Sequence, residues 1–382
     1  MTIKRRRGLL PLHEPGLRHV APNQESVFHS QILRAVGRLR MITVDMAVTL
    51  FRGTRWAVTR TTMRKHLARL HERKLVWCKP VSGVNVIQRV PTTATAGHPM
   101  PPTDGGRSAL VYGLTPHGLD WLVDIDSLSA GFLTREHRGR WALPASTHHD
   151  LYVAMWAVRT INTLTRIPGI SAIFLDLEFA LHEQAPTRPS TRRTRRQRMD
   201  ALLYARMHGQ NAMTDDDEEI DIPWHQGNAA VPGDVEFRWA LEFDNETEDR
   251  TILRDKFITY STLHQGTYQQ RIGGDVLLTL VVPTVKRAQQ LAYDFRLAWP
   301  GGWGLISTWT AGGIFASPLG RYLDLQTHRE VPLLSIPERD TNNRIIGYHC
   351  YDVDHGILRR QHVTVPLVKP LTEGMPLLEG DS

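Results

Sequence analysis

The spacing of apolar residues changes from helical to extended early in the chain, and this order limits the folds open to it. Apolar residues recur at helical spacing in three consecutive segments, which begin near Gln24, Thr43 and Thr59. Gly37 and Gly53 follow the first two segments, where helices commonly end. The sequence therefore predicts three short helices in this region.

Extended segments follow the three helices. Residues 75–78 and 84–87 are β-prone and flank Ser82-Gly83, a turn signal. Residues 109–112 are extended again and lead into Leu114-Thr115-Pro116-His117-Gly118. Three helices, a β wing and a closing strand are the layout of a winged helix-turn-helix.

This final motif resembles the L-T-x-x-G that closes many winged-helix regulators of bacteria. We expect a winged helix-turn-helix domain over residues 23–125, behind a basic tail over residues 1–22.

The third predicted helix carries cations outside its apolar stripe, which consists of Met63, Leu67 and Leu70. A recognition helix buries one stripe and offers cations and small polar groups to DNA. The alternative is a charged solvent face on a protein-binding module. We predict that helix and wing bind duplex DNA through one set of residues: Arg55, Thr59, Arg60, Thr61, Arg64, Lys65, Arg69, Lys79 and Arg89.

Composition agrees with a nucleic-acid partner but does not require one. The formal net charge is +7, and 39 of the 46 Lys and Arg residues are arginine. Arginine matches phosphate in bidentate geometry, although a GC-rich coding bias gives the same excess.

Several classes of protein are excluded. No apolar run is long enough for a membrane span, and no signal-peptide core follows the first arginines. The two cysteines, Cys78 and Cys350, give neither a disulfide framework nor zinc-finger spacing. Zinc and nucleotide motifs are absent from the sequence. We therefore expect a cytoplasmic protein with no membrane, zinc or nucleotide partner.

The second half alternates between helices and strands. After an expected linker over residues 126–145, the predicted elements are, in order, a helix from 146, strands over 172–179, 199–204 and 235–244, a helix over 246–264, and a strand over 275–282. This αβββαβ order is that of the restriction-endonuclease-like core, which makes the chain α+β or α/β. We expect that domain over residues 146–312 and a C-terminal extension over 313–382.

Two charged inserts interrupt this domain, a basic one over residues 183–198 and an acidic one over 209–233. Blocks of like charge are usually solvated. The two inserts neutralise one another, or the acidic block masks the basic block until DNA competes; the sequence leaves both readings open.

Carboxylates gather at the predicted strand ends. Asp200 begins one strand, while Glu242 and Asp244 end the next and face the same side of it. Lys256 lies at the border of the buried face of the following helix. Carboxylate oxygens are the ligands that Mg²⁺ or Mn²⁺ prefers, and a lysine beside them can orient an attacking water. The three carboxylates are therefore candidate metal ligands and, with Lys256, candidate catalytic residues.

These residues lie in short motifs that together resemble the replication-relaxation family of plasmids and mobile elements. The motifs are Arg198-Met199-Asp200-Ala201, Leu241-Glu242-Phe243-Asp244 with Thr247, and Leu253, Lys256 and Tyr260 at their helical spacing. His149-Asp150-Leu151 and Thr284-Val285-Lys286-Arg287 resemble two further segments of that family. The resemblance covers about residues 25–310 and implies a winged helix joined to a nuclease-like domain.

The carboxylate motif departs from that of active endonucleases of this fold, because Asp244 stands where they carry lysine. Lys256 is either a migrated replacement or the partner of Asp244 in a structural ion pair of an inactive, DNA-binding relic. His149 is either a satisfied core residue or a phosphate contact or general base beside Asp200.

Two functions follow as hypotheses. The first is a duplex-DNA-binding protein of a plasmid or mobile element that acts in replication initiation or DNA relaxation, with Mg²⁺-dependent nicking as a further possibility. The second is a non-enzymatic transcription regulator whose nuclease-like half mediates dimerisation or partner binding. Expected partners are duplex DNA, a second copy of the chain, and replication or mobilisation proteins.

Overall fold

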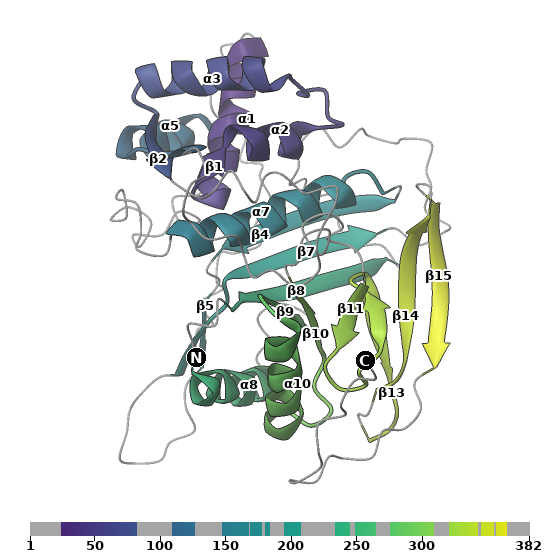
Figure 1. Cartoon of the computed structure of the whole chain (residues 1–382). Helices are drawn as coiled ribbons and strands as arrows, with labels where there is room; N and C mark the ends of the chain where they lie inside the picture. The colour runs from purple at the N-terminus through teal and green to yellow at the C-terminus, as the bar shows by residue number, and fades with distance from the viewer. Residues whose placement is uncertain are drawn as a thin grey trace, which may run out of the picture. The chain divides into compact units, whose positions relative to one another are not determined.

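The computed structural model describes most of the chain. The described residues are 24–81, 109–126, 147–167, 169–177, 180–183, 195–207, 234–244, 249–264, 276–308, 321–342, 345–354 and 357–364. They form seven helices and four β-sheets, which confirms the predicted mixture of α and β structure (Figure 1). No helix among these residues has the length and apolar character needed to cross a membrane.

Several predictions lie outside the described residues. These are the basic tail, nearly all of the linker, the acidic insert, much of the basic insert, the strand over 84–87 and Arg89. Contacts divide the chain into two units, with the division inside helix α7 (Thr147–Leu164) between Val158 and Arg159.

The first unit contains the three predicted helices and a small antiparallel sheet. Its elements are, in order, α1 (Gln24–Leu39), β1 (Ile42–Thr43), α2 (Val44–Phe51), α3 (Arg60–Glu72), β2 (Val76–Val81), β3 (Ala109–Leu114) and α5 (Pro116–Asp126). Side chains of two threonines cap α2 and α3, because Thr43 accepts a hydrogen bond from the Met46 amide and Thr59 from the Thr62 amide. The predicted helix starts near these threonines are confirmed.

The core of this unit forms where the helical stripes meet. Ile32, Leu33 and Val36 of α1 are fully buried, as are Met63 and the two leucines that continue its stripe on α3. The sheet has the order β1-β3-β2, with Ile42 opposite Tyr112. The two-residue strand β1 was not predicted; it places the segment before α2 against the last strand.

The second unit is built on a seven-stranded sheet. Its elements are, in order, the end of α7, β4 (Ile170–Leu177), β5 (Ala180–Glu183), β6 (Arg195–Arg198), β7 (Ala201–Met207), β8 (Val235–Phe243), α8 (Arg250–His264), β9 (Leu277–Val282), α10 (Val285–Ala298), β10 (Gly304–Thr308), β11 (Arg321–Asp324), β12 (Glu330–Pro332), β13 (Ser335–Arg339), β14 (Ile345–Asp354) and β15 (Ile357–Thr364). The predicted elements of this half are confirmed, with ends that shift by a few residues.

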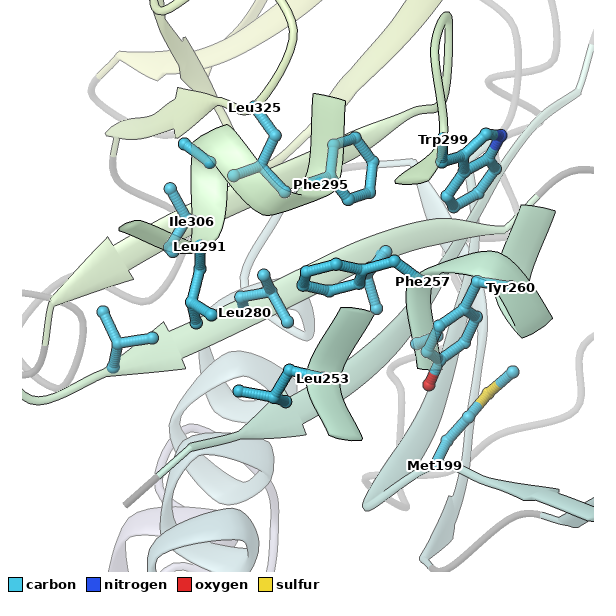
Figure 2. Close-up of a cluster of buried hydrophobic side chains, with 14 of the residues drawn as sticks. Met199, Leu253, Phe257, Tyr260, Leu280, Leu291, Phe295, Trp299, Ile306 and Leu325 are labelled. Carbon is cyan, nitrogen blue, oxygen red and sulfur yellow. The ribbon is translucent and has the colours of Figure 1, made fainter. Parts of the chain in front are cut away.

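The strand order of the large sheet is β12-β11-β10-β9-β8-β7-β4. Strands β8, β9 and β10 are parallel, whereas the pairings on either side of them are antiparallel. Helices α8 and α10 supply the crossovers between the parallel strands and pack on one face, where Phe257, Leu291 and Phe295 lie over Leu280 and Ile306 (Figure 2). Parallel strands need such crossovers, and the apolar helix stripes are buried in making them.

The sheet continues past residue 312, the predicted end of the nuclease-like domain. Strands β11 and β12 add antiparallel to β10, and their residues Tyr322 and Val331 are 1% exposed. The segment assigned to an extension therefore completes this sheet.

The remaining strands form a second antiparallel sheet, β13-β14-β15, within the same unit. The indole of Trp239 donates to the Leu333 carbonyl at 3.2 Å, and the rings of Phe237 and Tyr351 meet edge to face at 5.4 Å. Buried Asp324, at the end of β11, accepts hydrogen bonds from the Tyr348 hydroxyl and from the amides of the following turn. These contacts fasten the C-terminal sheet to the large one.

We expect Asp324 to make the stability of the second unit depend on pH. Burial raises the pKa of this carboxyl, although its hydrogen bonds act in the opposite direction. A raised folded-state pKa contributes stability below the unfolded-state value, and this contribution is lost as pH rises through the folded-state value. We expect Asp324→Asn to remove part of the decline in unfolding free energy between acidic and neutral pH, as measured by urea denaturation. Parallel pH profiles for the two proteins would contradict this.

Candidate functional site

The first candidate surface is the exposed side of α3. Its apolar stripe is buried, and the residues exposed outside it include one threonine and four cations: Arg60, Thr61, Arg64, Lys65 and Arg69. Residues four apart lie on one side of a helix, so Thr61, Lys65 and Arg69 form one row beside that of Arg60 and Arg64. No carboxylate interrupts the sequence between Arg60 and Arg69. We call this set of five residues the α3 face.

Neighbouring residues orient the start of the α3 face. The Arg60 guanidinium lies 2.6 Å from the Asp45 carboxylate of α2, with side-chain exposures of 58% and 33%. Such an exposed pair adds little stability, but it holds the Arg60 side chain toward α2. Arg55 lies over the Trp56 ring at 4.9 Å, and that ring stacks on Phe28 at 5.4 Å.

The other predicted DNA-binding residues have different positions. Thr59 caps α3, so its hydroxyl is already engaged by the Thr62 amide. On β2, the Lys79 ammonium lies over the Trp77 ring at 5.9 Å. Burial raises the pKa of Tyr112 on β3 to about 12, and the charge of Arg64 acts against this rise.

The L-T-x-x-G motif fixes the junction between α3 and β2. The Thr115 hydroxyl donates to the Lys74 carbonyl at 2.5 Å and accepts from the Gly118 amide at 3.0 Å. Lys74 has a φ of 58°, which turns the chain sharply after α3. A Cβ atom at Gly118 would lie 1.9 Å from the Leu75 carbonyl oxygen, so this position requires glycine. The structure thus gives a physical reason for the motif: it positions the end of α3.

The second candidate surface is the carboxylate cluster at the end of β8. Asp200, which follows buried Met199, accepts a hydrogen bond from the Phe243 amide at 2.7 Å. Glu242 is 5% exposed; its carboxylate lies 3.4 Å from the Lys256 ammonium and accepts from the Tyr260 hydroxyl. The predicted position of Lys256 at the border of the helix's buried face is confirmed, since it reaches this strand.

Asp244 has a different cation as its partner. Its carboxylate, also 5% exposed, accepts a hydrogen bond from Arg287 at 2.6 Å. Arg287 lies in the first turn of α10, where the Thr284 side chain caps the helix. In place of the expected Asp244–Lys256 pair, two pairs join β8 to two helices: Glu242 with Lys256 on α8, and Asp244 with Arg287 on α10. The sequence predicted no role for Arg287 itself, although the segment 284–287 that contains it resembles one of the family.

This arrangement does not fit a divalent metal. Glu242 and Asp244 already have cationic protein partners, and the Asp200 carboxylate is engaged by a backbone amide. In the part of the chain that the structure describes, no group of three or more His, Cys, Asp or Glu side chains could hold a metal ion. The ion pairs compensate the buried charges. The metal site therefore stays a prediction.

His149 lies in α7, in the part of that helix that belongs to the first unit, and its side chain is partly buried. The carboxylate cluster belongs to the second unit. The proposed pairing of His149 with Asp200 thus stays a prediction.

Comparison with known proteins adds one finding. A family model described as Replication-relaxation matches residues 33–277, which include α3, Asp200, both acids of β8 and Lys256. The curated proteins and the solved structures that were compared with the chain gave no match. The family match covers more than half of the chain and spans both candidate surfaces.

Proposed function

Since the chain belongs to the replication-relaxation family, we propose that it binds duplex DNA during replication of a plasmid or mobile element and that α3 is its recognition helix. The family itself indicates a replication-related protein of such an element. The observation that carries the DNA proposal is the α3 face, an exposed helix surface with four cations and no acid between them.

The architecture of the first unit supports this assignment. In a winged helix-turn-helix, the second helix of the motif enters the major groove and a β-hairpin follows it. Here α2 and α3 are joined by a capped turn, and β2, the next element after α3, pairs antiparallel with β3. We assign α3 to the groove and the β2–β3 pair to the wing.

The chemistry of the α3 face defines two kinds of contact. Arginine can pair with the O6 and N7 atoms of guanine, while lysine and threonine contact phosphates or thymine methyls. Each phosphate that a cation neutralises releases counterions, so affinity should fall steeply with salt.

We expect the double variant Arg64→Gln, Lys65→Gln to bind its DNA site, once that site is located by footprinting, on the order of 100-fold more weakly than the wild type. The reason is that each specific contact contributes about 1–3 kcal/mol. Arg60 is left in place because it pairs with Asp45. Fluorescence anisotropy over a salt series measures both affinity and slope. The control is Arg166→Gln with Arg329→Gln, which removes the same charge from exposed residues of the second unit. Equal affinities for the two double variants would exclude α3 as the recognition helix.

We assign the second unit a scaffold role rather than DNA cleavage. The two ion pairs at the end of β8 satisfy the acids that a nuclease would use for metal. The location of the DNA site separates replication from the transcription-regulator alternative. Protection of an origin or transfer region in a footprint supports the proposal, whereas protection confined to a promoter favours the regulator.

A further inference from the structure

The outer side of helix α8 carries apolar side chains that the proposed function does not use. Leu253, Phe257 and Tyr260 turn toward the core of the second unit (Figure 2). On the other side of the helix, Ile258 is 38% exposed, and Ile252, near the start of the helix, is 52% exposed. Exposed apolar residues are ordinary when they are scattered singly, so the surrounding residues decide whether this side of α8 is an interface.

Ile258 lies in the middle of the exposed side of α8, between two opposite charges. Successive residues of an α-helix are rotated by about 100° and rise by about 1.5 Å. Arg254 and Asp255 precede Ile258 by four and three residues, so they lie on either side of it and at nearly the same height. Both residues are exposed, and neither forms an ion pair within the part of the chain that the structure describes.

The charges on α8 cancel, although the whole chain is cationic. The formal net charge is +7, so two copies of the chain repel one another where their surfaces share this excess. The other Arg and Lys of the helix, Arg250 and Lys256, have acidic partners at 2.8 Å and 3.4 Å. The exposed Arg254 is balanced by the adjacent Asp255. A second copy can therefore approach this side of α8 without net repulsion.

We propose that the chain forms a homodimer through the outer side of α8, with the α8 helices of the two copies parallel. A two-fold axis parallel to α8 exchanges the two sides of the helix, so it brings Arg254 of each copy opposite Asp255 of the other. The two Ile258 side chains then meet at the axis. The contact is self-complementary, as a two-fold interface must be. This inference gives the second unit a partner and does not depend on DNA binding by α3.

An antiparallel pairing of the two helices about Ile258 lacks this charge complementarity. It would leave both copies of Arg254 on one side of the axis and both copies of Asp255 on the other. Like charges placed together across an interface oppose association. The order of the two charges along α8 therefore favours the parallel arrangement.

Complementary charge variants of the full chain test the pairing. Arg254→Asp leaves two acids beside Ile258, and Asp255→Arg leaves two cations there. Each variant alone should raise the dimer dissociation constant on the order of 100-fold, because like charges then face one another. A mixture of the two variants should form dimers as strongly as the wild type, since every acid again faces a cation.

Sedimentation equilibrium over a range of protein concentrations, without DNA, measures the wild type, both variants and their mixture. A wild type that stays monomeric at every concentration overturns the proposal. So does a wild-type dimer that neither charge variant weakens, or a mixture that associates no better than its two components. None of these outcomes bears on the α3 face, so the proposed function is tested separately.

Two further variants test the apolar contact and the orientation. Ile258→Ser should raise the dissociation constant about 10-fold or more, whereas Leu110→Ser, at an exposed position of the first unit, should leave it unchanged; equal effects exclude Ile258 from the interface. Thr262 lies about one turn beyond Ile258, so oxidation should link two copies of Thr262→Cys. The wild type, with Cys78 and Cys350, gives the background. A dimer without added crosslinking overturns the parallel pairing.

Discussion

Replacing Gly118 by alanine should destabilise the first unit by about 3 kcal/mol or more, the upper range for a side chain forced into a packed position. The new Cβ atom would lie 1.9 Å from the backbone oxygen of Leu75. No rotamer relieves this overlap, because both atoms are fixed by the backbone. Urea unfolding followed by tryptophan fluorescence measures the loss.

DNA binding should be lost along with stability, since Thr115 and Gly118 hold the turn that follows the end of α3. The control is His117→Ala, an adjacent exposed position on α5 that should change the unfolding free energy by less than about 0.5 kcal/mol. If Gly118→Ala unfolds and binds DNA like His117→Ala, the motif does not hold the junction.

The second large effect is expected at the end of β8. Arg287→Met should cost about 3–5 kcal/mol, because it leaves Asp244 buried without its charged partner. Adding Asp244→Asn should restore part of this loss, since the double variant buries no unpaired charge at that position. Chemical denaturation without divalent metal measures all three proteins, and Lys286→Met removes the same charge from an exposed neighbour.

A metal-binding role for the same carboxylates predicts a different result. Mg²⁺ or Mn²⁺ would then raise the melting temperature of the wild type, and supercoiled plasmid would be nicked by the wild type but not by Asp200→Ala or Lys256→Ala. We expect neither, because the protein's own cations already compensate these acids.

The elements that repeat a pattern over several turns could be predicted from the sequence. The stripe of Met63, Leu67 and Leu70 and the cap Thr59 gave both the position and the buried side of α3. Strand β1 has only two residues, too few to show any period. Strands β11 and β12 are nearly as short, and their place in the sheet depends on pairing with β10 rather than on their own composition.

In the candidate site, too, the sequence predicted features within single elements but not the contacts between elements. The positions of Glu242, Asp244 and Lys256 on their elements followed from local spacing. The pairing of cations with acids did not, because Arg287 and Asp244 are 43 residues apart and meet only when α10 packs against the sheet. Spacing along one element therefore identified the charged groups, while packing between elements decided their partners.

The strand order of the large sheet bears on how the chain folds as it leaves the ribosome. From β7 to β12, each strand lies beside the next one in the sequence. The sheet can therefore grow by one strand at a time in the order of synthesis, without waiting for a distant segment. Strand β9 is buried along its whole length in the finished protein. During synthesis, however, it forms the growing edge of the sheet until α10 and β10 have emerged. During that interval the free edge of β9 is open to pairing with another chain.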